Sequence, residues 1–256
     1  MDAGLSIDLR GRRALVTGGS RGVGKATALL LARAGADVGI GYLSRAGEAE
    51  AVVAELRALG VRAFAAAADV GMAEGARLLF DRCEKELGGV DIFVGNAGVW
   101  PPDDVPIAEM AEEQWARTMR ANLDSIFHCV RLAAARIGDG GRIVLVASTA
   151  GQRGEAGHAD YAASKGAVIS LTKSVAVELG PRNVTVNCVA PGWIDTEMVA
   201  GPMAGEGRAR IEAAIPLRRI ASAEDVAGPI LFLCSPLARH LTGEILNVNG
   251  GSVLCG

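Results

Sequence analysis

The most constraining feature of this sequence is a regular alternation of short apolar runs with longer amphipathic segments. The apolar runs are rich in β-branched residues and do not alternate with polar residues, which is typical of strands buried on both faces. Strands of this kind occur in parallel sheets that carry helices on each side. The sequence therefore predicts an α/β fold built on a doubly wound parallel sheet.

The predicted strands and helices keep the same alternating pattern along the chain. We find no internal repeat, low-complexity tract or linker, so residues 1–256 are predicted to form a single domain. Glycine and proline cluster at Trp100–Pro106 and Gly201–Gly207, where we expect long loops of the kind that often serve as lids. The predicted strands are Ala14–Val16, Val38–Tyr42, Val61–Ala67, Val90–Val94, Arg142–Ala147, Val184–Val189 and Ile245–Val248, and the predicted helices are Val23–Ala34, Gly47–Leu59, Ala73–Leu87, Glu112–Arg136 and Tyr161–Leu179.

Composition and charge argue against several classes of partner. Half of the residues are hydrophobic, the net charge is −3, and the lysines and arginines are scattered singly, which does not fit a nucleic-acid-binding surface. No apolar run approaches the roughly 18–20 residues that span a bilayer, so no membrane partner is expected. The histidines, His128, His158 and His240, lie far apart and no cluster has metal-ligand spacing, so no metal site is predicted.

The amino-terminal residues and the cysteines indicate the compartment. Residues Met1–Arg13 contain acidic side chains and lack the apolar core of a secretory signal. The five cysteines include no Cys-x-x-Cys pair, which favours free thiols in a reducing environment. We therefore expect a cytoplasmic protein with Cys83, Cys129, Cys188, Cys234 and Cys255 reduced.

A glycine-rich loop, Thr17–Gly24, joins the first predicted strand to the first predicted helix. Gly18, Gly22 and Gly24 allow a tight turn, a close approach of backbone to a pyrophosphate, and close packing of the helix on the strand. The start of the helix adds free N–H groups and the positive end of its dipole. A tight structural turn is the alternative, but the position in the chain and the absence of a P-loop pattern favour a dinucleotide site.

The residues after the second predicted strand indicate which dinucleotide binds. An NAD enzyme usually has an Asp or Glu there for the ribose 2′-hydroxyl, whereas this chain has no carboxylate before Glu48. Ser44 and Arg45, with Arg21 from the glycine loop, would instead bind a 2′-phosphate through charge-assisted hydrogen bonds. NADP(H) is therefore favoured over NAD(H), with ordinary surface arginines as the alternative.

Tyr161 and Lys165 lie one turn apart on a predicted helix and share a face. A phenol with an ordinary pKa of about 10 is a poor proton shuttle at neutral pH, and we expect the Lys165 ammonium to lower the pKa of Tyr161. Ser148 follows the strand Arg142–Ala147, at the edge where α/β sheets bind ligands, and its hydroxyl can hydrogen-bond a substrate oxygen. Together these residues predict acid/base catalysis by Tyr161.

On these motifs the chain resembles the short-chain dehydrogenase/reductase family, and most nearly its 3-oxoacyl-acyl-carrier-protein reductases and related NADPH ketoreductases. The resemblance covers Gly11–Gly251. It implies a Rossmann fold, a carbonyl substrate that is a small molecule or is bound to a carrier, and a homotetramer. The matching motifs are Thr17–Gly24, Asp69-Val70, Gly95–Gly98, Asn122, Ser148, Tyr161-x3-Lys165, Pro191-Gly192 with Thr196, and Asn249–Gly251.

The resemblance also implies a role for each matching residue. NADPH would deliver hydride to a carbonyl carbon while Tyr161 donates a proton and Ser148 steadies the oxygen. Asn122 would hold a water in a proton relay through Lys165. The implied catalytic residues are Asn122, Ser148, Tyr161 and Lys165, and the implied cofactor contacts are Gly18, Ser20, Arg21, Gly22, Val23, Gly24, Ser44, Arg45, Asp69, Val70, Asn96, Ala97, Gly98, Tyr161, Lys165, Pro191, Gly192, Ile194 and Thr196.

One position departs from the family pattern. Many relatives have Asn where this chain has Gly95, which puts a local strand contact in doubt.

The substrate is not identified by these motifs. Val99–Ala111 and a substrate loop at Trp193–Ile215 should build the pocket, with Trp100, Trp193 and Met198 as candidate walls or simply as loop packing. His158 is a candidate for the mouth of the site or a turn residue. Four arginines could meet an acidic carrier or be solvated: Arg208, Arg210, Arg218 and Arg219.

Three other functions compete with the ketoreductase interpretation. A non-catalytic dinucleotide sensor has no need of Ser148, Tyr161 and Lys165. An epimerase or dehydratase on this fold usually has a separate substrate domain, for which the chain has no room. An NAD-dependent alcohol dehydrogenase on the same fold stays open as an alternative.

Overall fold

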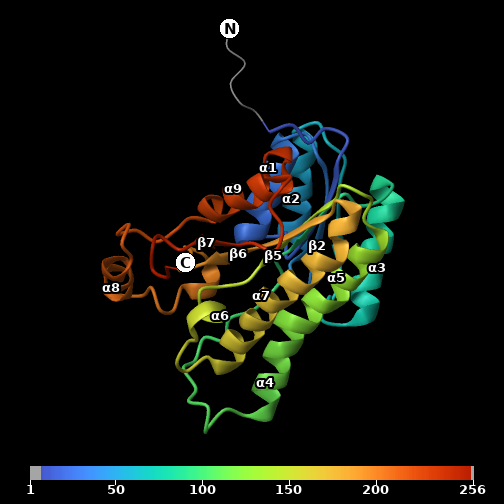
Figure 1. The fold of residues 1–256 in the computed structure, drawn as a ribbon. Coiled ribbons are helices and arrows are strands. Elements are labelled where there is room, and N and C mark those ends of the chain that lie inside the picture. Colours follow the sequence, from blue (N-terminus) through green and yellow to red (C-terminus); the bar gives the residue numbers. More distant parts are fainter. Residues whose placement is uncertain (1–6, 255–256) are drawn as a thin grey trace.

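The structure, a computed structural model, describes residues 7–254 of the chain. Its centre is a seven-stranded parallel sheet with the order β3-β2-β1-β4-β5-β6-β7 (Figure 1). This order reverses between β1 and β4, and in open α/β sheets ligands bind beyond the carboxyl ends of the strands at such a switch point. The strands are β1 (Arg13–Thr17), β2 (Asp37–Tyr42), β3 (Ala63–Ala67), β4 (Ile92–Gly95), β5 (Arg142–Val146), β6 (Thr185–Pro191) and β7 (Ile245–Val248).

Helices cover both faces of the sheet, which confirms the predicted doubly wound Rossmann-type fold (Figure 1). Each layer of helices has its own apolar core. One layer contains α1 (Gly22–Arg33), α2 (Ala46–Ala58) and α9 (Ala223–Cys234), and the other contains α3 (Ala73–Leu87), α5 (Ser125–Arg136) and α7 (Ala159–Leu179).

Strand β1 shows why the strand sequences lack polar alternation. Leu15 belongs to the core shared with α3, α5 and α7, whereas Ala14 and Val16 belong to the core beneath α1, α2 and α9. All three side chains are fully buried. Because both faces of the strand are covered, neither face can carry polar residues without burying them.

The predicted helix Glu112–Arg136 is not one regular helix. It consists of α4 (Glu112–Met119), a π-helical turn at Arg120–Asp124, and α5. The π turn contains Asn122, whose side chain bonds to the backbone of Val99. The prediction was therefore wrong about continuity, because apolar periodicity does not register one widened turn.

Three helices lie where none was predicted. They are the short helices α6 (Ala150–Arg153) and α8 (Gly207–Ala214), and the longer α9. Gly228 and Pro229 lie inside α9, and both residues normally argue against a helix interior. A capping box compensates at its start, where Asp225 N donates to Ser222 Oγ at 3.2 Å and Ser222 N donates to Asp225 Oδ2 at 2.8 Å.

Residues 193–220, which include α8, extend from the carboxyl edge of the sheet and are called the 193–220 segment below. Ile211, Ile215 and Ile220 form a small apolar cluster there, with Trp193 and Met203 packed against it. This cluster is separate from the two large cores. The segment therefore has a packing centre of its own beside the ligand edge of the sheet.

Two further observations concern the apolarity of the helices and the state of the cysteines. Over residues 7–254, no helix is long and apolar enough to cross a membrane. Cys83, Cys129, Cys188 and Cys234 are buried free thiols. The fifth cysteine, Cys255, lies outside the described residues, as do the first six residues of Met1–Arg13.

Candidate active site

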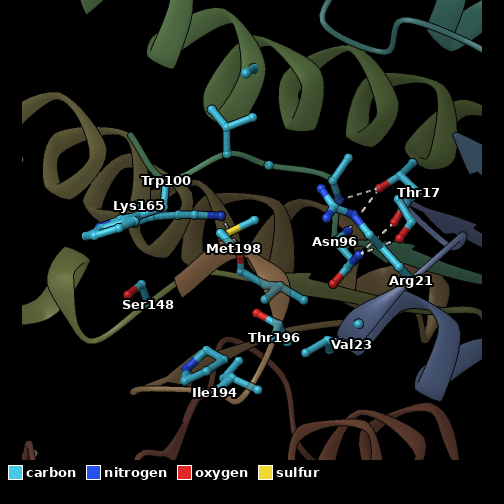
Figure 2. A pocket seen from close by; sticks show the side chains of 18 of the residues that line it. Thr17, Arg21, Val23, Asn96, Trp100, Ser148, Lys165, Ile194, Thr196 and Met198 are labelled. Atoms are coloured by element: carbon cyan, nitrogen blue, oxygen red, sulfur yellow. Dashed lines mark hydrogen bonds between the residues drawn. The ribbon is translucent and has the colours of Figure 1, made fainter. Parts of the chain in front are cut away.

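A cleft of about 670 Å³ opens at the carboxyl ends of the strands. Its walls come from the residues that follow β1, β2, β3, β4, β5 and β6, together with α7. The volume lies within the range of small-molecule and cofactor sites. All the predicted site residues except Gly24 and Asn122 line this cleft (Figure 2).

The glycine loop forms one end of the cleft. Gly18 and Gly22 have positive φ angles of 65° and 52°, a backbone region that side chains disfavour. Helix α1 starts at Gly22 with no side-chain cap and no acidic residue in its first turn. The first N–H groups of α1 and its positive dipole end are thus available to an anion such as a pyrophosphate.

Gly24 supports this loop from behind. A Cβ at Gly24 would lie 2.2 Å from Gly18 O and 2.6 Å from Asn96 Nδ2. No side chain fits there, because the nearest atom is backbone that cannot move without changing the turn. Gly24 therefore acts through close packing of the helix rather than by lining the cleft.

Asn96 and Thr17 fix the position of the loop. Asn96 Nδ2 donates to Thr17 O at 3.0 Å and to Gly18 O at 3.2 Å. Thr17 Oγ1 in turn accepts hydrogen bonds from the backbone N–H groups of Asn96 and Ala97, both at 3.0 Å. These bonds join the end of β1 to the end of β4, the strands on either side of the switch point (Figure 2).

The two predicted phosphate-binding arginines meet at the same end of the cleft. Arg21 lies in the glycine loop, and Arg45 follows β2. Arg21 Nη1 is 2.6 Å from Glu197 Oε2, and Arg45 Nη2 is 3.2 Å from the same oxygen. Arg45 Nη1 also lies 2.6 Å from Glu48 Oε1. The arginines thus form a cationic pair with two carboxylates beside it.

Ser148, Tyr161 and Lys165 form the other end of the cleft, beyond β5. Ser148 Oγ accepts a hydrogen bond from Ala150 N at 3.1 Å, which orients the hydroxyl. Lys165 Nζ is buried and donates to Val146 O at 2.9 Å. The ammonium lies 5.8 Å from the centre of the Tyr161 ring. The predicted catalytic side chains are therefore brought to one place from β5 and α7.

The expected effect of Lys165 on Tyr161 is not what the structure shows. Burial raises the pKa of Tyr161 to about 12, and this outweighs a hydrogen bond from Ser148 that lowers it. Charge repulsion from Glu155 raises the pKa further. The prediction of a lowered pKa was wrong because desolvation of the phenolate is the larger effect here. Tyr161 consequently holds its proton throughout the neutral range.

The pKa of Lys165 is shifted in the opposite direction. Burial lowers the pKa of its ammonium to about 8, because the charged form loses its hydration. The group therefore exchanges its proton within a mildly alkaline range. A protonated phenol beside a lysine that gives up its proton near neutrality is an arrangement suited to proton donation.

Asn122 stands behind this pair rather than in the cleft wall. Its Oδ1 accepts from Val99 N at 2.7 Å, and its Nδ2 donates to Val99 O at 2.9 Å and to Ser164 Oγ at 3.2 Å. A Cβ on Gly98 would lie 3.0 Å from Asn122 Oδ1 and 3.3 Å from Lys165 Nζ. The Asn122 side chain thus holds the Gly98–Val99 backbone against the lysine.

Aromatic side chains enclose the end of the cleft beyond Tyr161. Trp100 and Trp193 both line it and meet edge to face, with ring centres 6.2 Å apart. His158 is buried outside the lining, stacks on Trp100 at 4.5 Å, and has Nε2 at 2.9 Å from Pro101 O. His158 therefore secures the Trp100 loop, while Trp100, Trp193 and Met198 line the cleft as candidate substrate walls.

Close packing accounts for a glycine at position 95. A Cβ at this position would lie 2.8 Å from Ile126 Cδ1 and 2.9 Å from Leu145 Cδ2. The strand contact that was in doubt is filled by these apolar side chains. The change at Gly95 leaves the cleft intact.

Two of the four arginines proposed as contacts of an acidic carrier form ion pairs within the chain. Arg208 pairs with Asp195 and, at 3.4 Å, with Glu212, and Arg219 Nη2 donates to Asp225 Oδ1 at 3.0 Å. Their charges are therefore partly balanced locally, which weakens the case for a carrier-binding patch.

The sequence interpretation did not name several charged residues of the cleft, among them Glu155, Glu197 and Arg153. Glu155 is partly buried, and burial raises the pKa of its carboxyl. No spacing signal could have identified Glu197 as a partner of the arginines, because only the fold brings it to the glycine loop. Glu155, between Ser148 and Tyr161 in the chain, could have been flagged by its position alone.

Comparison with known proteins gives concordant matches. The sequence model of the family described as Enoyl-(Acyl carrier protein) reductase matches residues 18–252. The chain is 42% identical over 247 residues to the 3-oxoacyl-(acyl-carrier-protein) reductase FabG of Vibrio cholerae, covering 96% of this chain and 98% of the relative.

Solved structures agree with the sequence comparison. A short chain dehydrogenase from Burkholderia cenocepacia in complex with NADP is similar with a TM-score of 0.90 and 40% identity, over 95% of this chain and 98% of that one. A blue fluorescent protein from a metagenomic library, in complex with NADPH, is similar with a TM-score of 0.91 and 39% identity, over 96% and 100% of the two chains. The similarity therefore extends over both ends of the cleft.

Proposed function

This chain belongs to the short-chain dehydrogenase/reductase family, and from that premise we propose that it is an NADP(H)-dependent oxidoreductase that interconverts a ketone and a secondary alcohol. The observation that carries this proposal is the single cleft that joins an anion-binding glycine loop to Ser148, Tyr161 and Lys165. One end of the cleft fits a dinucleotide phosphate, and the other presents a proton donor.

The residues of the cleft fit a dinucleotide in their donor chemistry. The bare first turn of α1 is suited to the pyrophosphate, and the guanidinium groups of Arg21 and Arg45, with Ser44, are suited to a 2′-phosphate. When bound, NADPH supplies the hydride of the reduction. The other proposed contacts are Ser20, Val23, Asp69, Val70, Asn96, Ala97, Gly98, Pro191, Gly192, Ile194 and Thr196, which all line the same cleft.

The protein's own part in the reaction is to orient the substrate oxygen and to move a proton. Ser148 donates a hydrogen bond to that oxygen, and Tyr161 donates the proton from its phenol. Lys165, with its pKa of about 8, returns a proton to Tyr161. In this scheme Asn122 is a positioning residue, since its side-chain amide is committed to Val99 and Ser164.

The substrate class that we propose is a ketone, including 3-oxoacyl thioesters. The support is the identity to a 3-oxoacyl-(acyl-carrier-protein) reductase, and a carrier-bound substrate is part of the proposal. The matched family description names enoyl reductases instead. A donor hydroxyl pair formed by Ser148 and Tyr161 favours an oxygen as the proton acceptor, and therefore the carbonyl reaction.

Proposals on assembly and location rest on the family resemblance together with surface chemistry. We propose a cytoplasmic homotetramer formed through the exposed faces of α5 and α7. Phe127 on α5 and Val177 on α7 are 49% and 80% exposed, and a partner subunit would cover them in this assembly. Within each subunit, residues 193–215 would act as the substrate loop.

The test is an assay of the full chain against a panel of substrates, followed by absorbance of the reduced nicotinamide. The panel contains a 3-oxoacyl thioester, a 2-enoyl thioester, a simple ketone and a secondary alcohol, each with NADP(H) and NAD(H). We expect turnover of the ketone or the 3-oxoacyl thioester with NADPH. Turnover of the 2-enoyl thioester alone would replace the ketoreductase proposal, and binding of dinucleotide without any turnover would support a sensor.

The cofactor proposal has its own test by calorimetry. The double substitution Arg21→Ala and Arg45→Ala should weaken NADPH binding by about a hundredfold, since two charged hydrogen-bonding groups are removed. NADH binding should change by no more than about threefold, because NADH has no 2′-phosphate. Equal losses for the two cofactors would contradict the assignment of the phosphate to these arginines.

A further inference from the structure

Glu197 joins the two arginines of the cleft from a distant part of the chain. A single carboxylate oxygen, Oε2, lies 2.6 Å from Arg21 Nη1 and 3.2 Å from Arg45 Nη2. The two guanidinium groups come from the turns after β1 and β2, so this oxygen spans the place where the 2′-phosphate is proposed to bind. The carboxylate presents to the arginines the same kind of anionic oxygen that a phosphate would.

Glu197 belongs to the stretch of chain that also faces the other end of the cleft. It follows Thr196, whose Cγ2 would be 3.5 Å from a Cβ placed on Gly22, so this stretch lies close above the glycine loop. Thr196 and Met198 both line the cleft (Figure 2). Upstream, Asp195 N donates to Ala221 O at 2.8 Å. Residues 196–199 thus line the cleft beside the glycine loop, and the chain is anchored just before them.

The two ion pairs of Glu197 are weak enough to be replaced. The Glu197 side chain is 63% exposed and both arginine side chains are 43% exposed, and ion pairs in such positions contribute little because water and salt screen them. A phosphate monoester carries more negative charge than a carboxylate and offers three acceptor oxygens to the guanidinium groups. With both anions at one arginine pair, their mutual repulsion expels the weaker ligand.

We propose that Glu197 is a specificity-determining residue, an internal competitor that holds Arg21 and Arg45 until a 2′-phosphate displaces it. This inference rests on the proposed function, in which those arginines bind NADP(H). Displacement releases Glu197 from the arginines, and this release is driven by the 2′-phosphate of NADP(H), which NAD(H) lacks. Glu197 lowers the affinity for NADP(H). Its release when NADP(H) binds frees the neighbouring Met198, a candidate wall of the substrate end.

The test measures binding by the full chain with two small probes in place of the whole cofactor. Adenosine 2′,5′-bisphosphate has the 2′-phosphate, and adenosine 5′-monophosphate lacks it. By titration calorimetry, Glu197→Gln should bind the bisphosphate about fivefold more tightly than the wild type, the size expected for loss of an exposed ion pair. Its affinity for the monophosphate should stay within about twofold, since that probe has no phosphate at the arginines.

A matched control separates this effect from a general change in charge. Glu55→Gln removes one negative charge from the exposed Lys25–Glu55 pair on α1 and α2, where the two groups are 2.8 Å apart and outside the cleft lining. Both probes should bind this variant as they bind the wild type. Thermal unfolding of the two variants confirms that each is folded.

Hydrogen exchange gives a second readout that does not depend on activity. In the wild type, the bisphosphate should speed exchange of the backbone amides at residues 196–199, and the monophosphate should not. In the Glu197→Gln variant, the backbone amides at residues 196–199 should exchange fast before any probe is added. Slower exchange on adding the bisphosphate to the wild type would show that the stretch is held rather than released, and would overturn the proposal.

The remaining outcomes are also decisive. Weaker binding of the monophosphate by Glu197→Gln would mean that the carboxylate binds the ribose hydroxyl, and would overturn the proposal. Unchanged affinity for the bisphosphate would do the same. Failure of the cofactor assignment itself is recognised separately, because the wild type would then bind both probes equally and the double arginine variant would behave like the wild type.

Discussion

Tyr161 keeps its proton because burial is the largest influence on its pKa. The residue therefore acts as a proton donor. With a pKa of about 12 the phenol is a proton donor at any physiological pH. It becomes a base only when something in the cleft lowers that pKa. Ser148 already acts in that sense through its hydrogen bond, whereas Glu155 opposes it.

The first prediction concerns this phenol. Tyr161→Phe removes the donated proton and leaves the ring, so the turnover number should fall by about a thousandfold, as is usual for loss of a general acid. Calorimetry should find NADPH binding unchanged within about twofold, because the hydroxyl is at the substrate end. Measurable turnover close to that of the wild type would remove Tyr161 from the mechanism.

The second prediction concerns Lys165 and pH. Its lowered pKa of about 8 means that the ammonium is charged below that pH and loses its proton above it, while Tyr161 stays protonated. The turnover number for ketone reduction should therefore decline as pH rises through about 8, since the proton source of Tyr161 is lost. A pH profile of the turnover number from 6 to about 10 checks this.

The control is Lys165→Arg, which keeps its charge over the whole range because a guanidinium does not titrate there. Its residual rate should show no decline near pH 8. The same decline in both proteins would assign it to another group.

At the scale of elements, the start of α1 is the part of the site most sensitive to a single atom. Gly24→Ala would place a methyl group 2.2 Å from Gly18 O, so the helix start must move away from the loop. We expect dinucleotide affinity to fall at least tenfold and the melting temperature to drop, because the displaced N–H groups no longer converge on the pyrophosphate.

Gly47→Ala is the matched control for this change. Gly47 also lies in the first turn of a helix, α2, but nothing lies within 4 Å of the added methyl. Alanine is the better helix former, so this variant should be as stable as the wild type or slightly more so. Calorimetry and thermal unfolding of the pair test whether the close approach, rather than the loss of a glycine, is responsible.

Elements were predictable where a local pattern determines them, and not where distant contacts do. The bounds of α3 and β7 agree with the prediction, since their apolar pattern and flanking residues suffice. Helix α9 could not be recognised because its Pro229 is tolerated through the Ser222 cap and packing on the sheet. The π turn at Asn122 depends on Val99, which lies in a loop after β4.

The features of the site, too, were predictable where a local pattern determines them and not where distant contacts do. The positions of Ser148, Tyr161 and Lys165 followed from strand ends and helical spacing. The raised pKa of Tyr161 did not, because desolvation depends on how tightly the fold closes around the phenol. The contact of Glu197 with the arginines likewise exists only once the chain is folded.

At the scale of the whole molecule, the exposed apolar side chains of α5 and α7 belong to the proposed subunit interface. Val177→Asp should disrupt the proposed assembly, since a charge placed in a buried interface loses its hydration without gaining a partner. Light scattering coupled to gel filtration should find a smaller particle than the wild type.

Leu59→Asp is the control, because Leu59 is 42% exposed at the end of α2, away from α5 and α7. This variant should keep the particle mass of the wild type. A wild-type protein that elutes with the mass of one chain would refute the tetramer.

The small cluster of Ile211, Ile215 and Ile220 has a consequence for how such a protein diversifies. Ile211, Ile215 and Ile220 pack on one another and belong to neither large core, so substitutions in residues 207–220 leave the cores on either side of the sheet undisturbed. The preceding residues are constrained, because Ile194 packs against one of those cores and Glu197 pairs with the arginines of the cleft. Changes in substrate range are therefore expected to arise first in residues 207–220.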